Sequence, residues 1–130
     1  MKIKSKALAG VFVAGSFLLV AGPLSAHHSQ AVYDRTRDIT LIGNLTEFEF
    51  INPHVLLHLQ VKDDKGAGEE WFIQAGAPSN MRRRGWTRNT VKPGDQLTFT
   101  FHAARDGSKE GQLRKLSLNG KEIFNSADPD

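Results

Sequence analysis

Alternation of apolar and polar side chains with a period of two dominates this sequence and restricts the folds open to it. In residues 54 to 61 (HVLLHLQV) and residues 96 to 103 (QLTFTFHA), every second side chain is apolar. This period is typical of β-strands that bury one face, and convincing helical periodicity is nearly absent after residue 26. We therefore expect an all-β domain whose inward side chains include Val55, Leu57, Leu59, Val61, Leu97, Phe99, Phe101 and Ala103.

A longer strand is predicted over residues 38 to 51 (DITLIGNLTEFEFI), which are rich in β-branched and aromatic residues. Its main apolar side chains change parity along the way: they are odd-numbered up to Leu45 and even-numbered from Phe48 onward. One face of a strand cannot hold both sets unless an extra residue is inserted. The pattern therefore predicts a bulge or a sharp bend between Gly43 and Glu47.

Turn signals separate the elements that follow. Residues 62 to 68 (KDDKGAG) are turn-forming by composition, and residues 70 to 75 resume a strand. Residues 78 to 86 (PSNMRRRGW) predict a short helix with Ser79 as its N-cap and Gly85 as its end.

A final strand is expected near residues 112 to 118, and Asn119-Gly120 then predicts a tight turn followed by a short edge strand. The predicted order is a long bent strand, two strands, a short helix and two strands. This order matches the OB-fold, a small five-stranded β-barrel with its helix between strands three and four. A small β-sandwich is the alternative, although an immunoglobulin-type sandwich would need about seven strands and no central helix.

Residues 1 to 26 have the layout of a cleaved secretory signal peptide: three lysines, an uncharged apolar run and a small-residue end. Cleavage after Ala26 would leave His27 first, and cleavage after Ser25 is the alternative. The protein is then expected to be periplasmic or secreted, without stable membrane insertion. We expect an N-terminal segment at 27 to 37, one domain at 38 to 124 and a flexible tail at 125 to 130.

Charge and cysteine content narrow the possible partners. Three of the 17 basic residues and none of the 14 acidic ones lie in residues 1 to 26, so the expected mature chain has a formal charge of zero. A nucleic-acid partner is therefore not expected, because such proteins carry a basic surface. The chain has no cysteine, so neither a disulfide nor a lipid-modified cysteine contributes.

Several stretches, read together, are similar to one known family. They are AHHSQAVYD, GNLTEFEFINPHVLLHLQV, EEWFIQAGAPSNMRRRGWTRNTVKPGDQLTF and DGSKEGQLRKLSLNGKEIF, which span His27 to Phe124. The sequence resembles the small exported bacterial proteins of domain-of-unknown-function family 6152. The resemblance implies an exported single domain and carries over no activity.

Histidines offer the strongest candidate chemistry, and a site built from His27, His28 and His54 is one prediction. A freed His27 would combine its α-amino group with its ring nitrogen, and His28 or His54 would complete a copper site. With Ala26 first, a histidine in third position also suits Cu²⁺ or Ni²⁺. The alternative is that the first two histidines are tolerated polar residues of a mobile terminus, and that His54 belongs to a corner shaped by Asn52 and Pro53.

A ligand or partner surface is the other candidate site. It comprises the outward strand residues His58 and His102 together with Arg83, Arg84, Trp86 and Arg88 of the arginine-rich segment. Guanidinium groups beside an indole suit carboxylates, phosphates or polyanionic envelope components. The favoured alternative packs Trp86 over an end of the barrel and pairs the arginines with Glu47, Glu49, Glu69 and Glu70.

No nucleophile elbow, phosphate-binding loop or zinc-protease pattern occurs, so the protein is not expected to be an enzyme. Glu47 and Glu49 lie two apart on one strand, which would suit two-carboxylate chemistry, but exposed acids are common surface charge. The sequence favours an exported binding module of unknown ligand. A copper-binding or copper-carrying protein and an accessory subunit of the cell envelope are the alternatives.

Overall fold

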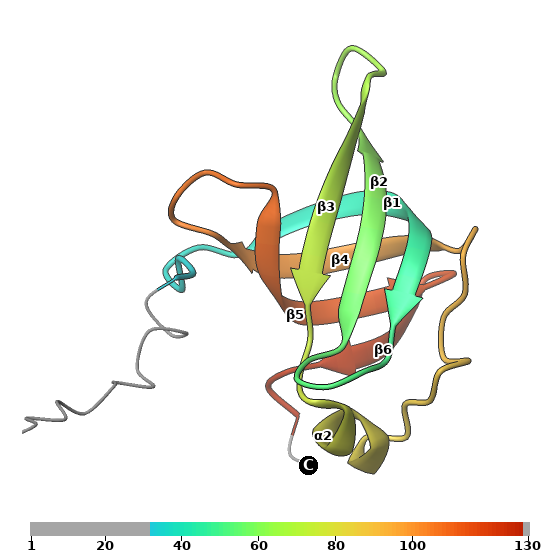
Figure 1. Ribbon diagram of the computed structural model, residues 1–130. Coiled ribbons are helices and arrows are strands. Elements are labelled where there is room, and N and C mark those ends of the chain that lie inside the picture. Colours follow the sequence, from blue (N-terminus) through green and yellow to red (C-terminus); the bar gives the residue numbers. More distant parts are fainter. Residues whose placement is uncertain (1–31, 129–130) are drawn as a thin grey trace, which may run out of the picture.

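The computed structural model describes residues 32 to 128, which form one closed β-structure with a short helix at one end (Figure 1). The strands are β1 (Ile39–Glu49), β2 (Leu56–Lys62), β3 (Gly68–Gln74), β4 (Gln96–Ala103), β5 (Glu110–Leu118) and β6 (Lys121–Asn125), and the helix is α2 (Pro78–Arg83). Among these residues no helix has the length and apolar character needed to span a bilayer.

The strands are hydrogen-bonded in the order β3-β2-β1-β4-β5-β6, and a parallel pairing of β3 with β5 closes the first five into a barrel. The long strand β1 makes this closure possible because it serves two neighbours: its first half pairs with β4 and its second half with β2. The strand order and the helix between β3 and β4 are those of the OB-fold. The predicted fold class is confirmed, and β6 extends the barrel as an additional strand.

The predicted irregularity in β1 is a β-bulge between Leu45 and Glu47, opposite β2. Leu45 points inward and is 1% exposed, and Phe50 on the other parity is also inside, at 4%. The extra residue at the bulge is Thr46. It turns the following odd-numbered side chains, Glu47 and Glu49, to the outer face, as a bulge in one strand of an antiparallel pair does.

The barrel interior contains the apolar residues that the alternation predicts. Phe99 and Phe101 are fully buried and stack with ring centroids 5.4 Å apart, and Trp71 lies 5.0 Å from the Phe101 ring. Since β2 and β4 both send every second side chain inward, the core is continuous across the barrel. The inward side chains of these two strands and of the residue before β2 are Val55, Leu57, Leu59, Val61, Leu97, Phe99 and Phe101.

The helix α2 begins at Pro78, and Ala77 occupies the N-cap position without any side-chain cap. Proline at the first helical position loses no hydrogen bond, because the N–H it lacks would have had no partner inside the helix. The predicted Ser79 cap is therefore wrong. The predicted end is correct: Gly85, with φ of 84°, follows the C-cap residue Arg84.

Trp86 closes the end of the barrel next to α2. Its side chain is buried, at 3% exposure, and its Nε1–H donates to the carbonyl oxygen of Ile123 at 3.2 Å. Its ring meets Phe48 and Phe124 edge-on, at centroid distances of 6.1 and 5.6 Å. Of the two interpretations of Trp86, packing over the barrel end is the one that the structure shows.

Both predicted turns between neighbouring strands are present. The loop between β2 and β3 spans residues 63 to 67, and the β5–β6 hairpin turns at Asn119 and Gly120. These two residues have φ of 52° and 76°, and positive φ at both central positions is the signature of the type I′ turn that this dipeptide favours.

Chain segments outside the strands are also tied to the barrel. Before β1, the N–H of Asp34 donates to Ala103 at 2.8 Å, and the N–H of Arg105 donates to Val32 at 2.9 Å. After β6, the N–H of Ser126 donates to Arg114 at 2.8 Å. The expected flexible tail is therefore held where it is described, up to residue 128.

Candidate functional site

Three carboxylates surround one imidazole on the outer face of β1, β2 and β3. His58 lies on β2 and is paired across the sheet with Glu47 on β1 and with Phe72 on β3. Side chains that face each other across antiparallel strands project from the same side of the sheet. The strand register therefore places the imidazole between acids that are distant in sequence.

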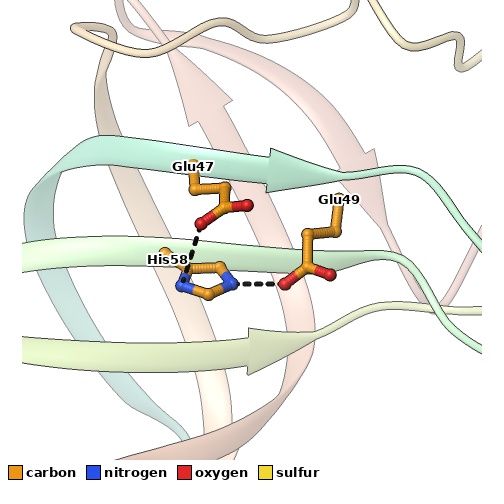
Figure 2. Close-up of side chains that lie close together, drawn as sticks. All are labelled: Glu47, Glu49 and His58. Carbon is orange, nitrogen blue, oxygen red and sulfur yellow. Dashed lines mark hydrogen bonds and ion pairs between the residues drawn. The ribbon is translucent and has the colours of Figure 1, made fainter.

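The closest contact joins His58 Nε2 to Glu49 Oε1 at 2.6 Å, and the opposite ring nitrogen, Nδ1, lies 3.9 Å from an oxygen of Glu47 (Figure 2). Nδ1 is also 3.9 Å from an oxygen of Glu70 on β3. The imidazole is largely buried, with 14% of the side chain exposed, whereas Glu47 is exposed. The cluster therefore opens to solvent on the Glu47 side.

The imidazole packs against its cross-strand neighbour on β3. Its ring meets the ring of Phe72 edge-on, with centroids 4.9 Å apart. The bulge residue Thr46 donates its hydroxyl to the backbone carbonyl of His58 at 3.2 Å. A ring held by an aromatic neighbour and a strand is a rigid ligand, so little ordering would be needed when something binds to it.

Glu47, Glu49 and His58 have the donor set of a transition-metal site. One candidate ligand atom from each side chain lies within 4.8 Å of the other two. Zn²⁺ binds imidazole nitrogen and carboxylate oxygen at about 2.0–2.2 Å, so two ligands of one ion are about 4 Å apart or less. Because the two glutamates lie at opposite ring nitrogens, one of their side chains would have to rotate to place all three ligand atoms around one ion.

A shallow cavity of about 250 Å³ is lined in part by Phe72, the residue whose ring packs against His58. Its polar lining includes Tyr33, Gln74 and Glu110, and the Tyr33 hydroxyl donates to the side-chain oxygen of Gln74 at 3.3 Å. Burial raises the pKa of Tyr33 above its usual value, and the negative charge of Glu110 raises it further. The phenol therefore stays neutral here and serves as a hydrogen-bond donor.

Of the three predicted metal ligands, His54 alone lies in the part of the chain that the structure describes. His54 is exposed in the connection between β1 and β2, and the candidate metal group there does not include it. His27 and His28 lie outside the described residues, so a copper site at the mature N-terminus stays a prediction.

His102 projects from β4 far from His58. Its Nε2 lies 2.9 Å from an oxygen of Asp38, immediately before β1, whereas His58 contacts β1 near its opposite end. His102 is 8% exposed. The sequence predicted an outward His102 on a contact surface, and this prediction is wrong. The segment before β1 lies beside the end of β4 and covers the His102 side chain.

The arginine-rich segment does not pair with the acids named for it. Within residues 32 to 128, Glu47, Glu49 and Glu70 contact His58, and Glu69 binds Lys109 at 3.1 Å.

The arginines have other partners. Arg83 donates to Asn80 at 2.5 Å, and Arg84 donates to the carbonyl oxygens of Asn125 and Asp128 at 2.9 Å each. Arg82 lies over the Phe50 ring, and Arg88 is exposed. Trp86 was predicted as part of a ligand or partner surface, but its side chain is buried. The acid-pairing prediction is wrong because α2 sits at the barrel end, away from the outer face of β1 to β3.

Sequence reasoning identified Glu47 and Glu49 as a carboxylate pair and His58 as an outward histidine, without joining them. The missing information was the register between β1 and β2. The signal was present in part: the predicted bulge turns both glutamates outward, and His58 is the central polar residue on the outer face of the next strand.

Comparison with known proteins identifies the family to which this chain belongs. A family model described as "Family of unknown function (DUF6152)" matches residues 16 to 114. The chain belongs to this family. The DUF6152 match includes every residue of the cluster, from Glu47 to Glu70. No curated protein sequence matches the chain.

Among solved structures, this DUF6152 chain is similar to two crystal forms of Rim1, described as a mitochondrial single-stranded DNA binding protein from S. cerevisiae. One form has a TM-score of 0.49 at 16% identity and covers 64% of this chain and 94% of the yeast chain. The other has a TM-score of 0.49 at 11% identity and covers 65% and 94%. DNA binding is the property of the yeast protein.

Proposed function

We propose that this protein is an exported, periplasmic OB-fold binding module whose β1–β3 face binds a divalent transition-metal ion through Glu47, Glu49 and His58. The observation that carries the proposal is the convergence of two carboxylates and one imidazole within 4.8 Å on a packed sheet. Strands two and three also form the face with which OB-folds commonly bind ligands.

The donor set selects the class of ion. An imidazole nitrogen favours Zn²⁺, Cu²⁺ or Ni²⁺, while Ca²⁺ and Mg²⁺ prefer oxygen ligands only. The hydrogen bond of 2.6 Å between His58 and Glu49 contains a proton that a metal ion would replace. Metal binding is therefore expected to release a proton and to weaken as the pH falls.

The charge of this face opposes a nucleic-acid ligand. Glu47, Glu49 and Glu70 all lie around His58, and phosphate groups would meet three carboxylates there. Their repulsion for one another is relieved by a cation instead. The proposal therefore follows the chemistry of this face and does not extend the yeast protein's DNA binding to it.

The test is a metal titration in a background that lacks the two predicted ligands closest to the N-terminus. His27 and His28 are both replaced by Ala, and Zn²⁺, Ni²⁺, Ca²⁺ and Mg²⁺ are titrated calorimetrically. We expect Zn²⁺ or Ni²⁺ to bind with a Kd of about 10 µM or tighter. Replacement of His58 by Gln should weaken binding more than tenfold, or about 1.4 kcal/mol.

A matched control uses His54→Gln, which removes an imidazole outside the cluster and should leave the Kd unchanged. Paramagnetic Cu²⁺ gives a second readout, because it should broaden the amide signals of β1, β2 and β3 first. Broadening confined to the region around His54, or equal affinity of the parent and His58→Gln proteins, would refute the proposal.

A further inference from the structure

A second cavity, of about 290 Å³, lies beside α2 at the barrel end. Its lining residues are Phe50, Arg82, Trp86, Thr87, Arg88 and Asn89. Phe50 and Trp86 are 4% and 3% exposed, so they form an apolar floor, while the four polar residues stand exposed around it. Phe50 directly follows Glu49 but points inward, on the other side of the chain from the His58 cluster.

The cavity carries positive charge that no acid neutralises. None of its six lining residues is acidic, and within residues 32 to 128 neither Arg82 nor Arg88 forms an ion pair. The guanidinium carbon of Arg82 lies 5.4 Å from the centre of the Phe50 ring. A guanidinium that rests on a ring keeps its in-plane N–H donors for another partner.

Neighbouring arginines are arranged differently, which separates this cavity from general surface charge. Arg83 is bonded to Asn80, and Arg84 is committed to two backbone carbonyls near the end of the chain. Neither lines the cavity. Arg82 and Arg88 line the cavity on either side of its apolar floor, so the cavity offers positive charge next to a buried apolar surface.

We propose that this cavity binds a small organic oxyanion, a carboxylate or a phosphate ester, whose apolar group rests on Phe50 and Trp86. Arg82 and Arg88 would receive the oxyanion, because planar guanidinium donors match the oxygens of both groups. Thr87 and Asn89 supply further polar groups at the rim. This site is independent of the metal site on the β1–β3 face.

The experiment uses Trp86 as its own reporter. The chain has two tryptophans, so Trp71→Phe leaves Trp86 as the only one. Benzoate and phenyl phosphate are titrated into this variant and Trp86 fluorescence is followed, with neutral benzamide and inorganic phosphate as comparisons. For ligands of this size we expect a Kd of about 1 mM or tighter for the favoured oxyanion.

Arg88→Gln should weaken binding at least fivefold, and Arg83→Gln, on the same helix end but outside the cavity, should leave the Kd within twofold. Chemical-shift changes at the backbone amides of Thr87 and Asn89 give a second measurement in the parent protein. A stronger response to benzoate identifies a carboxylate ligand, and a stronger response to phenyl phosphate identifies a phosphate ester. Benzamide binding as tightly as both oxyanions, or equal losses in the two arginine variants, would overturn the proposal.

Discussion

Strand β5 approaches β4 closely at Gly111, which makes this position a sharp test of the packing between these two strands. Gly111 lies on β5, where it pairs with Ile73 of β3 and Ala103 of β4. A Cβ atom there would lie 3.0 Å from Phe101 Cγ and 3.1 Å from the backbone oxygen of His102, and closer still to Phe101 Cδ2. Gly111→Ala therefore forces a collision at the seam of the barrel.

The cost follows from how little Phe101 can move. Its ring is fully buried, with Phe99 stacked at 5.4 Å on it and Trp71 at 5.0 Å. Overpacking of such a site costs about 1–3 kcal/mol, and the entropy removed from the unfolded chain returns about 0.4–1 kcal/mol. We expect a net loss of about 1.3 kcal/mol, which lowers Tm by about 5–10 °C for a domain of this size.

Gly68→Ala is the matched control, because the added Cβ would also collide, here with the side chain of Gln60. It would lie 3.2 Å from Gln60 Cδ and closer to the amide nitrogen. That amide is the far end of a flexible side chain and can rotate away. We expect a change within about 0.5 kcal/mol in stability.

Both variants are measured by urea denaturation, followed by circular dichroism and tryptophan fluorescence. If Gly111→Ala is as stable as the parent protein, or if Gly68→Ala loses as much stability as Gly111→Ala, the close approach of Gly111 to Phe101 and His102 described above is refuted.

Two further predictions concern the site and the elements that hold it. Tyr33 is the single tyrosine, and its absorbance at 295 nm should titrate with a midpoint above 10.0, the ordinary pKa of a tyrosine. Glu110→Gln should lower this midpoint but leave it above 10.0, because burial raises the pKa more than the charge of Glu110 does. The stability that this raised pKa contributes is complete below pH 10.0 and is lost as the pH rises through the pKa of the folded state. A titration midpoint at or below 10.0 would contradict the structure. Deletion of Thr46 removes the extra residue and leaves Leu45 and Glu47 alternating inward and outward in a regular strand, so by urea denaturation it should cost about 1 kcal/mol. Deletion of Thr98 from the regular part of β4 should cost several kcal/mol, because it sends either Leu97 or Phe99 to the wrong face. Equal losses would show that Thr46 is not the extra residue of the bulge.

Local patterns were sufficient to predict most of the fold. The alternation in β2 and β4 identifies the inward residues, the parity change after Leu45 locates the bulge, and Asn119-Gly120 locates the last hairpin. Each of these features depends on residues close together in sequence. The helix start was the local error, because Pro78 and Ser79 both carry start signals and proline at the first position prevailed.

The site required information that the sequence does not carry locally. His102 has the parity of a surface residue, and it is buried because the chain near Tyr33 pairs at Ala104, next to it. The arginines of the segment 82 to 88 were assigned to four acids, of which three surround His58 and the fourth, Glu69, binds Lys109. In both cases the deciding contacts join residues that are far apart in sequence, so they depend on the strand order and register.

The bulge in β1 connects the fold with the proposed chemistry. If Thr46 were paired regularly with β2, Glu47 and Glu49 would take the same parity as the inward Leu45, so the irregularity that keeps them out of the barrel also gathers them beside His58. Their oxygens lie within 4.8 Å of one another, and two unit charges at that distance repel by about 1 kcal/mol even in bulk water. One imidazole can offset at most one of the three surrounding carboxylates, and only when it is protonated. A bound divalent cation would neutralise two of them while keeping His58 as a neutral ligand, so a cation is the occupant for which this arrangement of the strands is best suited.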